Sequence, residues 1–154
     1  MGSEPGGRGA GYAAGGPIGI RAAPGERDVT LVLDAGAFVA VERGERDLAA
    51  LIKREHLAGR APLTHGGVVA QVWRGGGGRQ VMIARLLPGV DVRALDDALG
   101  RRAGALLARA GGSDAIDAAV VCLAVDGDEI LTSDAADLTA LAEAADLHVD
   151  LVGV

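Results

Sequence analysis

The sequence predicts a three-layer α/β/α fold, in which helices cover both faces of a central parallel sheet. Short runs of β-branched and other apolar residues alternate along the chain with segments of helical pattern. The run VTLVLD at 29–34 is apolar without alternation, which is typical of a parallel strand that is buried on both faces. A chain of 154 residues, 49% of them hydrophobic, is large enough to form one core of this kind.

The elements follow one another in a regular order after a Gly-, Ala- and Pro-rich start. Residues 1–28 show neither a helical nor a strand period, and we expect a disordered leader, because such a segment buries too little apolar surface to offset its ordering entropy. The folded domain is expected over 29–154. Its expected strands are 29–34, 61–65, 90–95, 128–132 and 147–154. Its expected helices are 35–44, 45–60, 67–74, 79–87, 95–112, 114–125, with Ser113 as the cap, and 133–145.

Charge and cysteine content narrow the class of protein. The net charge of −6 argues against a uniformly basic nucleic-acid-binding surface, although a cation held by acidic residues would offset part of it locally. Cys122 is the only cysteine, so no internal disulfide can form. No apolar run approaches the roughly 20 residues of a membrane-spanning helix, and the start lacks the apolar stretch of a signal peptide. We therefore expect a cytoplasmic protein without a membrane partner.

Acidic residues from three separate segments are expected at one edge of the sheet. Asp34 ends the first strand, Asp134 lies just past the fourth, and Asp137 follows one helical turn later. Asp114 and Asp117 open an otherwise apolar helix and share one face of it. Open parallel sheets bind ligands outside the carboxyl ends of their strands. Because clustered carboxylates repel one another, a divalent cation such as Mg²⁺ is the natural partner of this arrangement.

A purely structural interpretation exists for some of these residues. Asp and Ser at helix starts commonly cap the helix, which can account for Ser113, Asp114, Ser133 and Asp134. Asp137 can complete a capping box. Capping does not account for Asp117, one turn inside an apolar helix, or for Asp34, directly after a buried strand.

Three segments resemble the PIN domain family, especially its VapC-like toxin branch: LVLDAGAFVAVERG, PLTHGGVVAQVWR and SDAIDAAVVCLAVDGDEILTSDAADL. The last segment is the most specific of them, and the resemblance covers nearly all of the chain from Val29 onward. It implies metal-dependent hydrolysis of RNA by a type II toxin that is paired with an antitoxin. It also implies Mg²⁺ or Mn²⁺ as the cofactor, with Asp34, Asp117 and Asp134 as catalytic metal ligands and Asp114 and Asp137 as further ligands.

The resemblance assigns supporting roles to other residues. Thr132 and Ser133 are expected to orient water or substrate. The second carboxylate of the family, usually a Glu, corresponds to Gln71, which brings no charge and is expected to orient water. Glu42 is a partial substitute for that carboxylate. The departure at Gln71 leaves open an alternative, in which the chain is a PIN-fold binding or regulatory module with a weakened site.

Partners and competing activities follow from the same residues. Arg43, Arg74 and Arg79 are expected to contact the RNA backbone, together with Arg46. A homodimer is expected, for which the apolar residues Trp73, Val81, Met82, Ile83 and Leu86 offer a face.

An aspartyl-nucleophile phosphatase is disfavoured, because no second Asp follows two residues after Asp34. A phosphate-binding P-loop is also disfavoured, because the GGGG stretch lacks the following Lys-Ser/Thr.

Overall fold

The computed structural model describes residues 28–75, 77, 78 and 80–154. Within this part of the chain, five strands form one parallel sheet and seven helices flank it, which confirms the expected fold class. The leader expected at 1–28 lies outside the described residues, apart from Asp28. The strands are β1 (Leu31–Leu33), β2 (Leu63–His65), β3 (Asp91–Arg93), β4 (Glu129–Thr132) and β5 (Asp150–Gly153). The helices are α1 (Ala35–Glu42), α2 (Arg46–Leu57), α3 (Gly66–Val72), α4 (Gln80–Leu86), the 3-10 helix η1 (Leu87–Gly89), α5 (Asp97–Ala110), α6 (Ala115–Leu123) and α7 (Ala135–Ala144).

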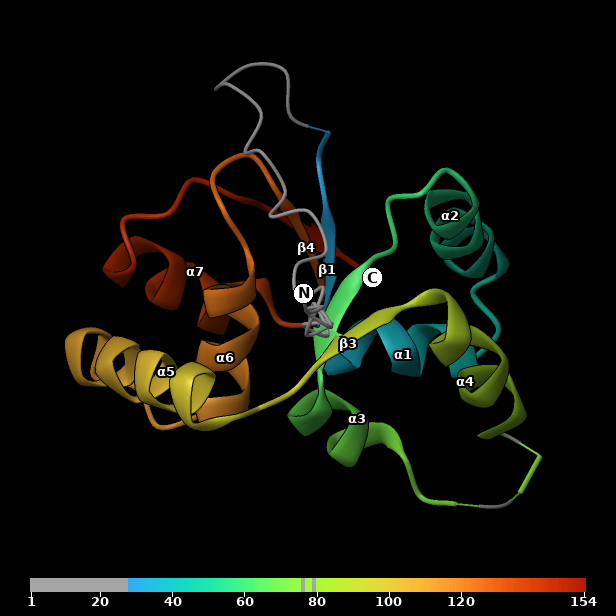
Figure 1. The fold of residues 1–154 in the computed structure, drawn as a ribbon, viewed down its shortest axis with the longest axis horizontal. Coiled ribbons are helices and arrows are strands. Elements are labelled where there is room, and N and C mark those ends of the chain that lie inside the picture. The colour runs from blue at the N-terminus through green and yellow to red at the C-terminus, as the bar shows by residue number, and fades with distance from the viewer. Residues whose placement is uncertain (1–27, 76, 79) are drawn as a thin grey trace, which may run out of the picture.

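The helices form two layers, one on each side of the sheet (Figure 1). Helix α1 packs against α2, α3 and α4, while α5, α6 and α7 pack against one another on the other side. The core between the layers consists of strand residues such as Val32 and Ile130 and helix residues such as Phe38 and Val120, all of them fully buried. The longest of the described helices, α5, has 14 residues, and none of these helices has the length and apolarity needed to cross a bilayer.

The sheet has the strand order β3-β2-β1-β4-β5. The chain therefore moves outward from β1 through β2 to β3, and then returns to place β4 and β5 on the other side of β1. Val32 pairs with Leu63 on one side and with Ile130 on the other, so β1 is the central strand. All five strands end at the same edge, which we call the carboxyl edge, and the opposite edge is the amino edge. The strand order reverses between β1 and β4, the position at which open α/β sheets form a ligand-binding crevice.

Two local expectations were wrong. Helix α6 is capped by Asp114 and not by Ser113, because the Asp114 carboxylate reaches the backbone N–H groups of Ile116 and Asp117. Ile83 is fully buried in the core and cannot belong to an exposed dimer face. The strand expected at 61–65 is confirmed in part as β2, whose last residue, His65, is fully buried.

Candidate metal centre

Asp34 occupies the middle of the carboxyl edge, between the end of β1 and the first turn of α1. Its Oδ1 accepts a hydrogen bond of 2.6 Å from the backbone N–H of Ala35, so the side chain caps α1, and the expectation that capping does not account for Asp34 was wrong. Its Oδ2 accepts a hydrogen bond of 2.8 Å from the hydroxyl of Thr132. Asp34 is 7% exposed, and these two bonds hold its carboxylate in one orientation at the point where the strand order reverses.

Thr132 connects the two central strands at this edge. Its buried hydroxyl donates to Asp34 and accepts a hydrogen bond of 3.0 Å from the backbone N–H of Asp134. Asp134 in turn caps α7, with its Oδ1 3.5 Å from the backbone nitrogen of Asp137. The Thr132 side chain is therefore committed to two protein partners and orients carboxylates. Ser133 lies exposed in the connection between them.

Gly36 allows the segment around Asp34 and the β4–α7 connection to approach each other closely. Gly36 lies in the first turn of α1, where an added Cβ would stand 2.5 Å from Ser133 Oγ and 2.8 Å from Ser133 Cβ. Backbone atoms of Ser133 lie at least as close, and they cannot move aside as a flexible side chain can. Glycine at position 36 is thus required for the separation between the Asp34 segment and the β4–α7 connection.

Asp114 and Asp117 reach the same edge from the first turn of α6. The Asp114 Oδ1 accepts hydrogen bonds of 2.8 Å from Ile116 N and 3.1 Å from Asp117 N, which leaves its second oxygen exposed. The Asp117 side chain is partly buried, and among the described residues no donor hydrogen-bonds to its carboxylate. The Asp117 charge is therefore stabilised by fewer hydrogen bonds than the Asp114 charge.

The electrostatics of Asp117 show that the carboxylates lie near one another. Burial, the largest cause, and the repulsion of neighbouring carboxylates raise the pKa of Asp117 to about 6. The neighbours that contribute, in decreasing order, are Asp114, Asp34, Asp137 and Asp134. We call these five residues the carboxylate cluster; three separate segments of the chain contribute to it.

A hollow of about 340 Å³ opens beside the cluster, between α5, α6 and α7. Asp114, Asp117 and Asp137 line it on one side, and Leu107 and Leu141 line it on another. Part of the cluster therefore borders a space that a ligand can enter.

The donor atoms of the cluster fit a hard divalent cation, but they are not preassembled around one. Carboxylate oxygens are the ligands that Mg²⁺ and Mn²⁺ prefer, and a partly buried carboxylate with a raised pKa gains most from a nearby cation. In the described part of the chain, however, no group of three His, Cys, Asp or Glu side chains stands close enough to hold an ion. Asp114, Asp134 and Asp137 are exposed, but the Asp114 and Asp134 side chains also cap α6 and α7, so binding of a cation would compete with these capping bonds.

The remaining candidates lie outside this cluster or carry other contacts. Gln71 is exposed on α3, and no hydrogen bond joins its side chain to a carboxylate in the described part of the chain. Glu42, at the other end of α1 from Asp34, accepts a hydrogen bond of 3.4 Å from the buried Gln80 side chain. Arg43 is exposed and follows α1 at the end remote from Asp34. The Arg74 guanidinium donates to the carbonyls of Ala70 and Trp73 at the end of α3, and Arg79 lies outside the described residues.

Two buried polar residues were not predicted from the sequence. His65 hydrogen-bonds to the backbone of both α3 and α6. Asp128, at the amino edge, is 1% exposed and accepts hydrogen bonds from the backbone N–H groups of Thr30 and Val125. The signal available for each was a polar residue next to glycine between two regular elements, where side chains often bond to nearby backbone.

Comparison with known proteins adds no identification: no family model matches the chain, and no curated protein is significantly similar to it.

Proposed function

We propose that this protein is a Mg²⁺- or Mn²⁺-dependent endoribonuclease of the PIN type, acting as the toxin of a type II toxin–antitoxin pair. One observation supports the proposal: the β1–α1 junction, the first turn of α6 and the β4–α7 junction each bring carboxylates to the carboxyl edge of the sheet, although not around a single point. Their mutual repulsion contributes to the raised pKa of Asp117. The strand order and the PIN-like motifs of the sequence agree with this assignment.

The proposal gives each residue a defined task. Asp34, Asp117 and Asp134 hold the cation, and the exposed Asp114 and Asp137 supply further oxygens or orient water. A divalent ion bound there lowers the pKa of a water molecule and neutralises charge on the phosphate. Thr132 keeps the Asp34 carboxylate directed at the site, because its hydroxyl bonds to Oδ2.

The proposed partners follow from the surface as well as from the motifs. RNA is the substrate, and Arg43 and Arg74 are exposed cations that can contact its backbone. An antitoxin protein and a second copy of this chain complete the proposal, with the cytoplasm as the compartment. Trp73, Val81 and Met82, which are 41%, 43% and 39% exposed, support the dimer.

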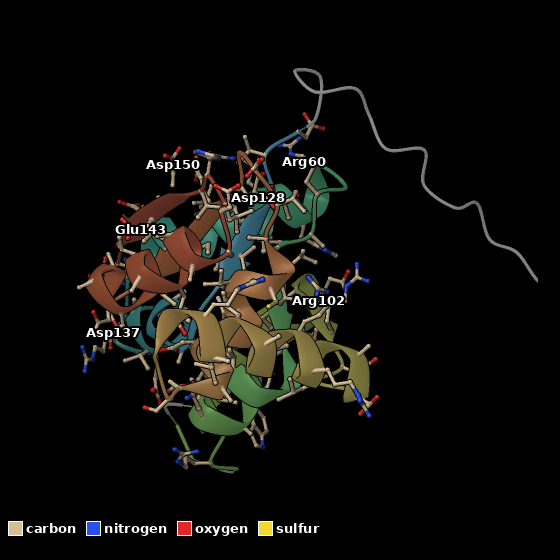
Figure 2. All side chains as sticks on the ribbon, turned by 90° about the vertical axis from the view of Figure 1, so that its left-hand side faces the viewer. Arg60, Arg102, Asp128, Asp137, Glu143 and Asp150 are labelled. Carbon is tan, nitrogen blue, oxygen red and sulfur yellow. The ribbon has the colours of Figure 1, made fainter. Side chains whose placement is uncertain are left out.

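The test is Mn²⁺ binding and RNA cleavage by the full chain, measured by calorimetry and with a labelled RNA. We expect Asp34→Asn and Asp117→Asn each to lower the cleavage rate by at least ~100-fold, because each removes a ligand charge. Glu143→Gln is the matched control, since it removes one exposed acidic charge near the other end of α7 from Asp137 (Figure 2). Cleavage that survives both Asp substitutions would reject the assignment of these residues.

A second candidate is a PIN-fold binding module without nuclease activity. Two observations favour it: Gln71 stands where the family has a carboxylate, and no three ligating side chains in the described region are gathered around one point. This candidate predicts binding of Mn²⁺ that is weak or absent, and no metal-dependent cleavage at any Mn²⁺ concentration. The same titration therefore separates the two functions.

A further inference from the structure

His65 is a buried histidine whose two ring nitrogens both have backbone partners. Its Nδ1 accepts a hydrogen bond of 3.1 Å from the N–H of Gly67, which caps α3. Its Nε2 therefore carries the proton and donates to the carbonyl of Ile116, in the first turn of α6, over 3.0 Å. The ring is fully buried, and burial lowers the pKa of His65, so it stays neutral in this one tautomer.

The packing around the ring is equally specific. A Cβ added to Gly67 would lie 2.5 Å from Ile116 Cδ1 and 2.8 Å from His65 Cε1. The first turns of α3 and α6 thus approach the His65 ring so closely that no side chain fits at position 67. A hydrogen bond and a steric contact independently fix α6 against the end of β2.

This contact lies between two members of the carboxylate cluster. Ile116, which accepts the bond from His65, directly precedes Asp117. Strand β2 pairs with β1 through Leu63 and Val32, so His65 and Asp34 stand at equivalent positions, two residues further along neighbouring strands. A shift of α6 away from β2 would move Asp117 relative to Asp34.

We propose that His65 is a positioning residue of the carboxylate cluster, whose hydrogen bond to Ile116 sets the distance between Asp117 and Asp34. The consequence for metal binding rests on the proposed function, whereas the consequence for the distance does not. The carboxylates that face Asp117 are Asp114, Asp34, Asp137 and Asp134. A shift of α6 would therefore change the separation of Asp117 from the other carboxylates, and with it the room for a cation between them.

The experiment compares two variants that each keep one half of the His65 contact. His65→Asn retains an acceptor for Gly67 N–H near Nδ1 and loses the donor to Ile116. His65→Gln retains a donor near Nε2 and loses the acceptor. The readouts are the distance between Asp117 and Asp34 in crystal structures of the metal-free full chain, and Mn²⁺ affinity by calorimetry.

We expect His65→Asn to lengthen the distance between Asp117 and Asp34, and to weaken Mn²⁺ binding by about 10-fold. His65→Gln should stay close to the wild type in both. If His65→Asn lowers only the melting temperature and leaves the distance and the Mn²⁺ affinity unchanged, His65 is a structural residue and the inference is overturned.

Two further outcomes are also decisive. If the wild-type chain binds no Mn²⁺, the proposed function fails, while the metal-free structure of His65→Asn still decides whether His65 sets the distance. If His65→Asn does not fold, Gly67→Ala replaces it, because its added methyl group must displace the Ile116 side chain or the His65 ring. An unchanged distance between Asp117 and Asp34 in Gly67→Ala would contradict the inference.

Discussion

Asp128 at the amino edge and Asp117 at the carboxyl edge are both shielded from water, but they differ in the hydrogen-bond donors and charges that surround their carboxylates. Asp128 is 1% exposed, and its two oxygens accept hydrogen bonds of 3.1 Å and 2.9 Å from backbone N–H groups. Asp117 is partly buried, no described residue donates to its carboxylate, and the nearest charges are other carboxylates. Figure 2 shows Asp128 in the upper part of the molecule and Asp137, a neighbour of Asp117 in the cluster, lower down at the left side.

The difference separates a structural carboxylate from one that is available to a ligand. Asp128 joins the start of β1 to the turn after α6, because Thr30 and Val125 are its donors. A buried charge that is fully hydrogen-bonded stabilises the fold and has little capacity left for a ligand. The unmatched charge at Asp117 costs stability in the metal-free protein, and a bound cation would remove that cost.

The largest expected effect is on stability at the amino edge. Asp128→Ala leaves the N–H groups of Thr30 and Val125 without their carboxylate partner, and we expect the free energy of unfolding to fall by about 3 kcal/mol. Urea denaturation measures this. Asp128→Asn keeps one acceptor oxygen and should lose about half as much. Mn²⁺ affinity should not change in either variant, and a loss of affinity in Asp128→Asn would break the contrast between the two edges.

At the carboxyl edge, the variant Asp117→Asn is expected to raise the free energy of unfolding instead of lowering it. Because folding raises the pKa of Asp117 from 3.8 to about 6, its charge favours the unfolded chain progressively as the pH rises through this interval. Asp117→Asn should therefore match the wild type near pH 4. At pH 8 without metal it should be more stable by about 1 kcal/mol, an amount reduced by solvent screening of a partly exposed group.

Addition of Mn²⁺ sharpens this prediction. Saturating metal should make the wild type the more stable of the two proteins at pH 8, since only the wild type retains the full ligand set. Urea denaturation with and without Mn²⁺ measures the difference in the free energy of unfolding between the two proteins under each condition. A wild type that is already more stable than Asp117→Asn in the absence of metal would show that Asp117, like Asp128, is a structural carboxylate.

The smallest expected effect concerns Gln71. Gln71→Glu introduces a carboxylate at the position that corresponds to a Glu in the PIN motif that the sequence resembles, and we expect Mn²⁺ to bind about 3- to 10-fold more tightly, as a site gains affinity with each ligand charge. Ala70→Glu is the matched control, because it adds the same charge to an exposed neighbouring position on α3. Equal affinities in the two variants would show that position 71 is not at the metal.

The fold was predictable because its signals are local and repeated. The continuous apolar run before Asp34 and the alternation of strands and helices predict a parallel sheet, and the strand ends place Asp34 and Asp134 at one edge. His65 and Asp128 were not predictable in the same way. Their roles depend on backbone donors and acceptors as far as 98 residues away in the chain, as for Asp128 and Thr30. Ile83 shows the same limit, since only the packing of α4 against α1 decides that its side chain is buried.

The hydrogen bond from Thr132 to Asp34 joins residues 98 positions apart and has a consequence for synthesis of the protein. Translation adds Thr132, the hydroxyl partner of Asp34, 98 positions after Asp34 itself, and Asp134 follows two positions later. The first strand must therefore wait for the fourth before the cluster can assemble. If the proposed function holds, activity can appear only after β4 has been synthesised and has paired with β1.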